Sequence, residues 1–329
     1  MSALFASDSP RVLVADIGGT NARFALAGRD AHGAIVIAGR HDLRADDYVG
    51  LGDCLEAYLA TLAADDRPHA AAFGVASPVA GDRITLTNRA WSFGVAEFRA
   101  RFGWDRFEVV NDFAALGHAA PALKPGDWRS LVGPPWPEQL PRVVSLVGPG
   151  TGFGVGAVAR GDGGYLVVPS EGGHASFAPF DALEAEILKV MLRRFPRVSN
   201  ERVLSGPGLE NLHAALAEIR GAPASGLAAP AILEAALGGA DPLAAETVER
   251  FCLMLGGVMG DIALVQGAGA VALAGGIAPR LVEVLDTPAV RERFEAKGRA
   301  RDVMAAIPIA LIVHPEPALL GAARLIFTH

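Results

Sequence analysis

The chain has 329 residues and a mass of 34.0 kDa, a length that corresponds to about two domains. Hydrophobic residues make up 51% of it and charged residues 20%, which is the composition of a compact globular protein and excludes a disordered chain. The net charge is −7 and no run of five basic residues occurs, so we expect no nucleic acid among its partners.

Two apolar runs open the chain and flank a pair of glycines. Residues 12–17 form a nearly continuous apolar run, which is typical of a strand buried on both faces, and residues 22–27 form a second one. The residues between them predict the tip of a tight hairpin: Gly18, Gly19, Thr20 and Asn21. We expect glycine here because only glycine tolerates the backbone angles of such a turn.

The rest of the first third indicates an α/β domain. The spacing of apolar residues predicts a helix over 51–62, and short apolar runs predict strands at 35–39, 71–76, 82–86 and 107–110. Residues 121–141 then carry six prolines and two tryptophans without periodicity. This composition indicates a long loop, and we place a domain boundary in it.

The opening motif occurs a second time, 131 residues further on. Apolar runs at 143–147 and 153–159 flank Gly150, Thr151 and Gly152, as the first two runs flank Gly19 and Thr20. Two copies of one hairpin predict two similar lobes. The second lobe is rich in predicted helices between 181 and 267, and it is followed by strands at 271–274 and 307–313 and a helix at 317–326.

Nothing in the sequence directs the chain to a membrane or out of the cell. The first ten residues lack the basic and apolar parts of a signal peptide, and Cys54 and Cys252 are too far apart in sequence to suggest a disulfide framework or a metal motif. We therefore expect a cytoplasmic protein. Residues 262–279 are uncharged over 18 positions, but their glycines favour a buried helix that runs into a buried strand over a membrane span.

The two glycine-rich turns are candidates for phosphate binding. Backbone N–H groups and a hydroxyl at such a turn can hold phosphate oxygens, and Asp16 beside the first turn can hold Mg²⁺. An ordinary glycine hairpin is the alternative for either turn alone. No P-loop motif occurs, and the G-x-G-x-x-A sequence at 267–272 precedes a strand, which is the wrong context for a dinucleotide-binding turn.

Polar residues after three further segments suggest a site for an alcohol substrate. Asn111 and Asp112 end a predicted strand, where a carboxylate can take a proton from a hydroxyl that attacks phosphorus; a helix cap is the alternative. Glu171 and His174 flank two glycines and can bind the hydroxyls of a polyol. Glu201 can add an acceptor or serve as a capping-box acid.

Two weaker features complete the candidate site. Gly275 and Gly276 lie between a strand and a helix, where a base or ribose can approach the backbone closely. Trp91, near Thr87 and Asn88, can wall a sugar site, although a core position is the more frequent role of a tryptophan. One histidine and one glutamate fall short of a zinc site.

In this order and combination, these motifs closely resemble the bacterial ATP-dependent glucokinase family over residues 12–325: Asp16 to Arg23, Asn111 to Ala114, Gly150 to Gly152, Glu171 to His174, Glu201 to Gly208, and Ala274 to Ile277. The resemblance implies an α/β, two-lobed actin-like (ribonuclease H-like) ATPase fold with an interlobe cleft. It places residues 1–122 and 314–329 in a small lobe and 123–313 in a larger one. It also implies a homodimer.

The reaction implied by the resemblance is phosphoryl transfer from ATP to the 6-hydroxyl of D-glucose. It makes Asp112 the general base, and Asn111, Glu171, His174 and Glu201 the ligands of the other hydroxyls. Gly18 to Asn21 and Gly150 to Gly152 would hold phosphates, Gly275 and Gly276 would lie beside the adenosine, and Asp16 would assist Mg²⁺. The sequence departs from the family pattern at Pro149 and Ser170.

Three alternatives remain open at this point. A kinase for another hexose is one, although the cysteine-rich zinc segment of the repressor-type sugar kinases is absent. A sugar-responsive DNA-binding regulator would need a helix-turn-helix extension, and about ten residues precede the first predicted strand. An actin-like structural or switch ATPase would have no evident use for Glu171 and His174.

Overall fold

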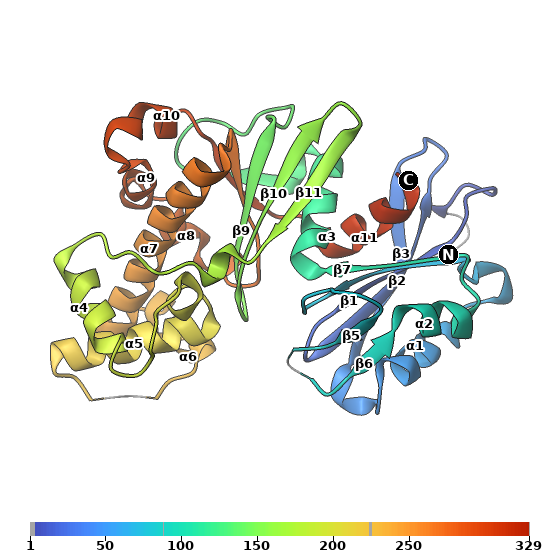
Figure 1. Ribbon diagram of the computed structural model, residues 1–329, viewed down its shortest axis with the longest axis horizontal. Coiled ribbons are helices and arrows are strands. Elements are labelled where there is room, and N and C mark those ends of the chain that lie inside the picture. Colours follow the sequence, from blue (N-terminus) through green and yellow to red (C-terminus); the bar gives the residue numbers. More distant parts are fainter. Residues whose placement is uncertain (1–3, 88, 224–225, 329) are drawn as a thin grey trace. The chain divides into compact units, whose positions relative to one another are not determined.

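A computed structural model of the chain describes residues 4–87, 89–223 and 226–328. The described residues divide into two compact units, which we treat separately (Figure 1). Unit 1 comprises Met1–Leu123 and His314–His329, and unit 2 comprises Lys124–Val313. Both units combine strands and helices, so the predicted α/β class is confirmed.

The sheet of unit 1 has five strands in the order β3-β2-β1-β4-β7. The first three strands pair antiparallel, whereas β1, β4 and β7 run parallel. A separate pair of short strands, β5 and β6, lies beside it. The bounds are β1 Val12–Ile17, β2 Asn21–Arg29, β3 Ile35–Arg44, β4 Ala70–Val75, β5 Arg83–Thr85, β6 Ser92–Gly94 and β7 Arg106–Asn111.

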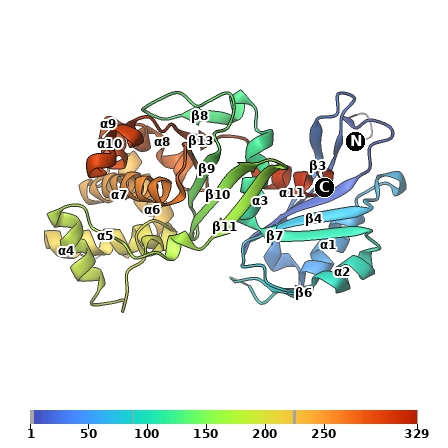
Figure 2. The same ribbon diagram turned by 45° about the horizontal axis from the view of Figure 1, so that its top comes forward.

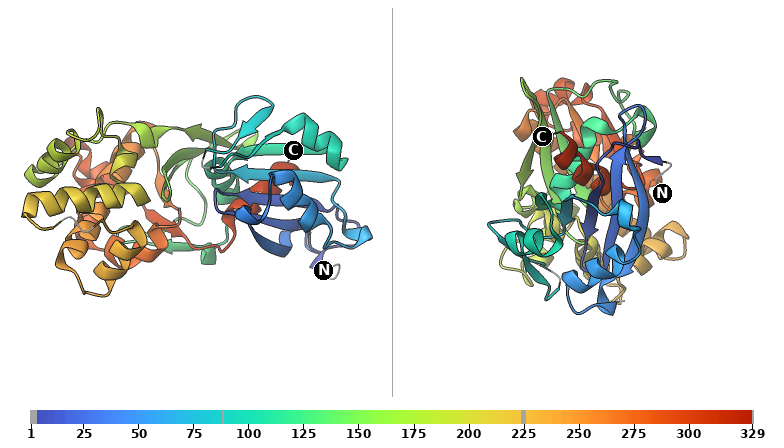
Figure 3. Two further views of the ribbon diagram at one scale, coloured as in Figure 1. Left: turned by 90° about the horizontal axis from the view of Figure 1, so that it is seen from below. Right: turned by 90° about the vertical axis from the view of Figure 1, so that its right-hand side faces the viewer.

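Helices cover both faces of this sheet. The bounds are α1 Leu51–Leu59, α2 Val95–Phe102, α3 Asp112–Ala119 and α11 Pro317–Phe327. Alternate residues of β1 point to opposite faces of the sheet: Leu13 packs into the core with α1 and α2, and Val12 and Val14 pack against α11. Figure 3 shows α11, in red, lying against the blue strands of this unit. The apolar run of β1 is continuous because both of its faces are buried.

The sheet of unit 2 has six strands in the order β11-β10-β9-β12-β13-β8. Its strands are β8 Trp128–Ser130, β9 Val143–Pro149, β10 Phe153–Gly161, β11 Gly164–Ser170, β12 Ala270–Leu273 and β13 Ile309–Ile312. Its helices are α4 Ala182–Met191, α5 Gly206–Arg220, α6 Ala229–Leu237, α7 Pro242–Gln266, α8 Val282–Leu285, α9 Pro288–Glu295 and α10 Arg301–Ala305. One large apolar core joins these helices to the sheet.

The two sheets repeat one arrangement, as the repeated hairpin predicts. In each, three strands pair antiparallel in the order third-second-first, and two further strands continue parallel to the first. Unit 2 adds β8 antiparallel to β13 at the edge (Figure 2). Strand β9 begins 131 residues after β1, which is the offset seen in the sequence.

Some predictions about elements need correction. The expected long loop over 121–141 is wrong at its centre, where β8 forms the sheet edge. Helices α2, α3, α9 and α10 and strands β6 and β11 were not predicted. The interpretation of residues 262–279 is confirmed, since α7 ends at Gln266 and β12 follows. In the part of the chain that the structure describes, no helix combines the length and apolar character needed to cross a membrane.

Candidate active site

The carboxyl edge of the unit 1 sheet brings together the acidic residues predicted from the first lobe. Asp16 of β1, Gly74 of β4 and Val110 of β7 are neighbours in register across three parallel strands. Strand β7 ends at Asn111, and α3 begins at Asp112. Because parallel strands present their carboxyl ends at one edge of a sheet, Asp16 and Asp112 lie at the same edge of this one.

A glycine in the central strand allows the close approach of α3. A Cβ atom on Gly74 would lie 3.2 Å from the Cβ of Ala115 and 3.7 Å from the Cα of Asp112. Any side chain here would push the start of α3 away from the sheet. Sequence reasoning missed Gly74, and the available signal was a glycine inside an otherwise apolar strand.

Asn111 serves as the N-cap of α3, as the alternative interpretation expected. Its Oδ1 accepts a hydrogen bond of 2.8 Å from the backbone N–H of Phe113, and its Nδ2 donates to the carbonyl oxygen of Ser77 at 3.2 Å. The backbone N–H of Phe113 is shared, because Oδ1 of Asp112 accepts from it as well. Capping and the placement of Asp112 are therefore compatible.

The electrostatic surroundings of Asp112 favour its protonated form more than water does. Burial and, to a smaller extent, the neighbouring carboxylate of Asp16 outweigh the lowering effect of the hydrogen bonds and together raise the pKa of Asp112 to about 6. A carboxylate with a pKa close to neutrality accepts a proton more readily than an ordinary aspartate does.

The first glycine-rich turn is a hairpin, as predicted, but the expected reason is wrong. Gly18 donates from its N–H to the carbonyl oxygen of Asn21 at 2.9 Å. Neither Gly18 nor Gly19 adopts a positive φ, so backbone angles do not require glycine here. Arg89 donates to the carbonyl oxygen of Gly19 at 3.0 Å, and the N–H of Ala45 donates to the carbonyl oxygen of Thr20 at 2.9 Å. These two hydrogen bonds connect the turn to the surrounding segments.

Asp16 has a cationic partner on the adjacent strand. Arg23 lies directly opposite Asp16 in the β1–β2 register and donates to its Oδ2 at 2.6 Å. Arg23 also lies 3.7 Å from a carboxylate oxygen of Asp42. Among the described residues, no three His, Cys, Asp or Glu side chains lie close enough together to hold a metal ion.

The second glycine-rich turn, Gly150–Gly152, is held by two segments of unit 2. Gly150 donates across the turn to the carbonyl oxygen of Gly152 at 2.8 Å, and the N–H of Gly206 donates to the carbonyl oxygen of Gly150 at 2.8 Å. On the other side, Ile277 donates to the carbonyl oxygen of Pro149 at 3.2 Å. Pro149, one of the departures from the family pattern, is thus part of the last ladder pair of this hairpin.

The Gly275–Gly276 turn lies beside the same hairpin. Gly275 has a φ of +87°, and a Cβ atom there would lie 2.5 Å from the carbonyl oxygen of Pro149. Gly276 faces open space. Glycine is therefore required at position 275 by the contact with Pro149. The surface at Gly276 is uncovered.

Glu171 and His174 form a tight turn against β10. A Cβ atom on Gly173 would overlap the carbonyl oxygen of Phe153, at 2.0 Å, so glycine is required by this close approach. The Nε2 of His174 lies 3.8 Å from a carboxylate oxygen of Glu171, and both side chains are more than half exposed. Arg197 fixes the turn by donating to the carbonyl oxygen of His174 at 2.7 Å. Ser170 accepts at 2.9 Å from the N–H of Gly172.

Glu201 joins this group from the segment before α5. Its carboxylate lies 3.8 Å from Nδ1 of His174 and accepts a 3.0 Å hydrogen bond from the backbone N–H of Phe153. The cap of the short helix that contains Glu201 is Ser199, whose hydroxyl accepts from Arg202. The capping-box alternative for Glu201 is therefore wrong, because its carboxylate faces β10.

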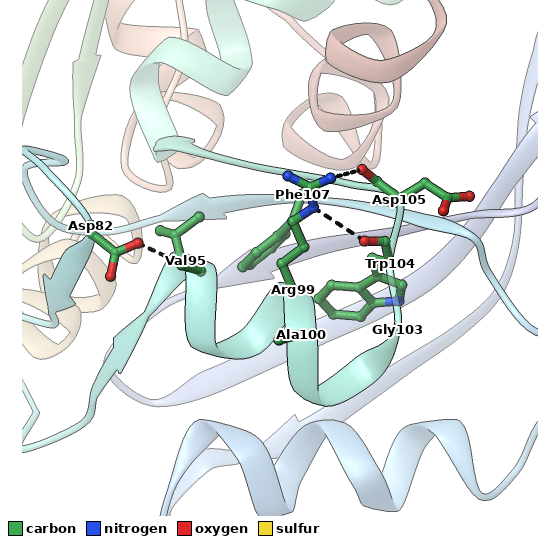
Figure 4. A pocket seen from close by; sticks show the side chains of 9 residues that line it. Asp82, Val95, Arg99, Ala100, Gly103, Trp104, Asp105 and Phe107 are labelled. Atoms are coloured by element: carbon green, nitrogen blue, oxygen red, sulfur yellow. Dashed lines mark hydrogen bonds between the residues drawn. The ribbon is translucent and has the colours of Figure 1, made fainter.

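The remaining candidates lie elsewhere. Trp91 is 5% exposed and belongs to the apolar core of unit 1, as the alternative interpretation expected, and Asn88 lies outside the described residues. A hollow of about 610 Å³ beside α2 contains none of the predicted site residues (Figure 4). Two of its polar side chains already have partners, since Arg99 donates to two backbone carbonyls and Asp82 accepts from the N–H of Ala96.

Comparison with known proteins identifies the family. The model of the Glucokinase family matches residues 13–329. A glucokinase from Aromatoleum aromaticum is 44% identical over 318 residues, which cover 96% of this chain and 95% of the relative. The chain belongs to the glucokinase family. A second glucokinase, from Paramagnetospirillum magneticum, is 45% identical and is covered to 98%.

The fold comparison agrees with the family. The crystal structure of a glucokinase from an Antarctic psychrotroph matches this chain with a TM-score of 0.87 at 36% identity, covering 97% of this chain and 99% of that one. The predicted actin-like ATPase fold is thereby confirmed. As a member of the glucokinase family, the chain is an ATP-dependent hexose kinase, a phosphotransferase with an alcohol acceptor.

Proposed function

We propose that this chain transfers the γ-phosphoryl group of ATP to the 6-hydroxyl of D-glucose, with Asp112 as the general base, giving glucose 6-phosphate and ADP. The observation that carries the role of Asp112 is its position at the carboxyl end of β7, partly buried beside Asp16, with a pKa raised to about 6. A base of this strength is largely ionised at neutral pH and can still be protonated by the attacking hydroxyl.

In this mechanism, Asp112 accepts the proton of the 6-hydroxyl as that oxygen attacks the γ-phosphorus. Asn111, whose orientation is fixed by its contacts with Phe113 and Ser77, binds a second hydroxyl of the sugar. Glu171, His174 and Glu201 bind further hydroxyls, since carboxylates accept and an imidazole donates or accepts hydrogen bonds.

The two glycine-rich turns bind the phosphates of the nucleotide in this proposal. The turn Gly18, Gly19, Thr20 and Asn21 supplies backbone N–H groups and a hydroxyl from unit 1, and the turn Gly150, Thr151 and Gly152 supplies them from unit 2. The N–H groups of Gly18 and Gly150 close these turns and are not among the phosphate donors. Gly275 and Gly276 border the adenosine, where the open surface at Gly276 leaves room for it. Phosphoryl transfer depends mainly on such positioning and on charge neutralisation.

Magnesium enters this reaction as part of the MgATP substrate. Mg²⁺ bound to phosphates needs only one or two carboxylates from a protein, so the single carboxylate of Asp16 suits this role. The ion would neutralise charge on the phosphates when bound. Arg23, paired with Asp16, limits the repulsion between that carboxylate and the incoming nucleotide.

Three further properties belong to the proposal. We place the enzyme in the cytoplasm, where ATP is available and where buried free thiols such as Cys54 and Cys252 persist. We expect a homodimer, which light scattering on the purified protein tests. Neither nucleic acid nor a membrane is required as a partner.

The decisive experiment measures ADP release in a coupled assay with ATP and, in turn, glucose, mannose, fructose, N-acetylglucosamine or no sugar. Glucose is expected to give the highest kcat/KM, and release without sugar is expected to be slow. ADP and polyphosphate serve as alternative donors, with glucose 6-phosphate as the measured product. A higher kcat/KM for another hexose would assign the chain to that sugar, and no sugar-dependent release would reject the proposal.

A further inference from the structure

One carboxylate of unit 2 contacts both the predicted sugar residues and the predicted phosphate turn. Oε2 of Glu201 accepts the 3.0 Å hydrogen bond from the N–H of Phe153, the residue that directly follows the turn. A Cβ atom on Gly152 would lie 2.7 Å from the same oxygen. The glycine at the end of the turn is therefore what allows the carboxylate to reach this backbone.

The second oxygen of Glu201 faces the other way. Oε1 lies 3.8 Å from Nδ1 of His174, and Nε2 of the same imidazole lies 3.8 Å from Glu171. Glu201 thus contacts the phosphate turn as well as the sugar residues, whereas Glu171 and His174 contact their own turn, Arg197 and Glu201. About a third of the Glu201 side chain remains exposed, so the side chain is open to a ligand.

The backbone near Glu201 also connects this segment to the Gly150–Gly152 turn. Ser205 caps α5 and donates from its hydroxyl to the carbonyl oxygen of Glu201 at 2.8 Å. The next residue, Gly206, donates its N–H to the carbonyl oxygen of Gly150. The segment from Glu201 to Gly206 therefore holds the turn at both of its ends, through a side chain at Phe153 and through the main chain at Gly150.

We propose that Glu201, besides binding sugar, is a positioning residue that fixes the Gly150–Gly152 turn for the nucleotide and couples the occupancy of the two substrate sites. A hydrogen bond to an ionised acceptor is stronger than a neutral one, so it holds the turn with its N–H groups in place before the nucleotide arrives. A sugar hydroxyl that binds Oε1 fixes the carboxylate and thereby the turn. By linkage, nucleotide binding then strengthens sugar binding by the same factor. The inference rests on the proposed function, because it assigns the turn to phosphates.

The test is nucleotide binding in the absence of sugar. Calorimetry measures the dissociation constant of MgAMPPNP for the full-length wild type and for Glu201→Gln, which keeps the size of the side chain and removes its charge. We expect the variant to bind about tenfold more weakly, the size of the change expected when a charge-assisted hydrogen bond is weakened. Glu171→Gln is the matched control, since it removes the same charge from the same group without touching the turn. Its MgAMPPNP affinity is expected to stay within about twofold of the wild type, while its KM for glucose rises.

Whether Glu201→Gln binds MgAMPPNP more weakly, equally or more tightly than the wild type decides whether Glu201 positions the turn. If Glu201 acts only as a negative charge near the phosphates, its neutralisation tightens MgAMPPNP binding, and the inference is overturned. An unchanged dissociation constant overturns it as well. If Glu201→Gln is unstable in a thermal melt, Glu201→Asp replaces it, because the shorter side chain keeps the charge but withdraws from Phe153, and the same weakening is expected.

A second measurement tests the coupling itself. The ratio of glucose dissociation constants without and with MgAMPPNP is expected to exceed 1 in the wild type and to fall towards 1 in Glu201→Gln. A ratio that is equal in both proteins overturns the coupling. If the wild type binds no MgAMPPNP at all, the proposed function fails, which is a different result from a nucleotide affinity that does not depend on Glu201.

Discussion

Asp112 combines two properties that a general base requires. It sits at the first position of α3, and burial beside Asp16 raises its pKa to about 6. We expect Asp112→Asn to lower kcat by at least ~10²-fold, because the amide cannot accept the proton, while the dissociation constant for glucose changes much less. Steady-state kinetics and calorimetry measure the two quantities. Asp65→Asn, an exposed acid of the same unit, is the control, and near-normal turnover of Asp112→Asn would rule out its role.

The raised pKa of Asp112 also sets a pH limit on catalysis. Only the ionised carboxylate accepts a proton, so activity is present above the pKa and is lost as the pH falls through it. We expect kcat/KM for glucose to fall about tenfold per pH unit below about 6. A pH–rate profile measures this. An acidic limb near 4, the range of an ordinary aspartate, would contradict the environment described for Asp112.

The same pKa shift has the opposite consequence for stability. The unfolded chain loses the Asp112 proton near pH 4, whereas the folded chain keeps it until about pH 6, so ionisation destabilises the fold as the pH rises through this window. We expect Asp112→Asn to raise the free energy of unfolding by about 1–3 kcal/mol at pH 7.5 and to change it little at pH 4. Urea titrations at both pH values measure the difference. Equal effects at the two pH values would contradict it.

Residue types and spacing singled out candidate residues but did not predict the side chains and backbone groups that they contact. A strand-end Asn-Asp pair indicated both a cap and a carboxylate, and the structure shows that Asn111 makes the cap. Gly74 and Arg23 become meaningful only through strand register, which sets each beside an acidic residue. Glu201 was assigned to an alcohol or to a capping box, because its contact with Phe153 spans 48 positions and leaves no local signal.

At the level of elements, α3 depends on α11 for its position. A Cβ atom on Gly321 of α11 would lie 1.7 Å from the carbonyl oxygen of Ala115 in α3, so the two helices touch backbone to backbone. We expect Gly321→Ala to force α3 away and to displace Asp112 at its start. The free energy of unfolding should fall by about 1–3 kcal/mol, the usual cost of overpacking, and kcat should fall more than the affinity for glucose does.

The control for this prediction is a glycine with room for a side chain. A Cβ atom on Gly161, at the end of β10, would meet nothing within 4 Å, so Gly161→Ala should leave stability and kcat nearly unchanged. Thermal melts and steady-state kinetics compare the two variants. Equal behaviour of Gly321→Ala and Gly161→Ala would show that helix contact does not position Asp112.

The elements that sequence patterns predicted are those buried on one or two faces. Strands β1, β4, β9 and β12 appear as apolar runs because helices cover them. In contrast, nearly every residue of β11 is exposed, so it carries no apolar alternation. Strand β8 has three residues and lies within a proline-rich segment, and α3 has eight, which is too short for a clear helical period.

At the scale of the whole molecule, unit 2 is an insertion into unit 1. The chain enters unit 2 after Leu123 and returns at His314, and α11 then buries Leu319 and Leu325 against unit 1. We expect Lys124–Val313, expressed alone, to unfold cooperatively because all residues of its large apolar core lie within it. Residues 1–123 alone should not, because one face of their sheet lacks its helix.

Circular dichroism melts of the separate fragments measure this difference. The control joins residues 1–123 to 314–329 through a short flexible linker, which is feasible because α11 contacts the segment Ala120–Ala122. This fused unit 1 should regain a cooperative transition. A cooperative transition of residues 1–123 without α11 would show that the final helix is dispensable for folding.

The two sheets share one strand order but differ in where their acidic residues lie. At the offset of 131 residues, Asp16 corresponds to Val147, which is fully buried. No acid stands where Asp112 would have its counterpart, since β13 is followed by Val313 and His314. Unit 1 thus has both the glycine hairpin and acids at the carboxyl edge of its sheet, whereas unit 2 has the hairpin and the acids Glu171, after β11, and Glu201, which accepts from Phe153 of β10. The general base that we propose, Asp112, therefore has no counterpart in unit 2, although the two sheets share their strand order.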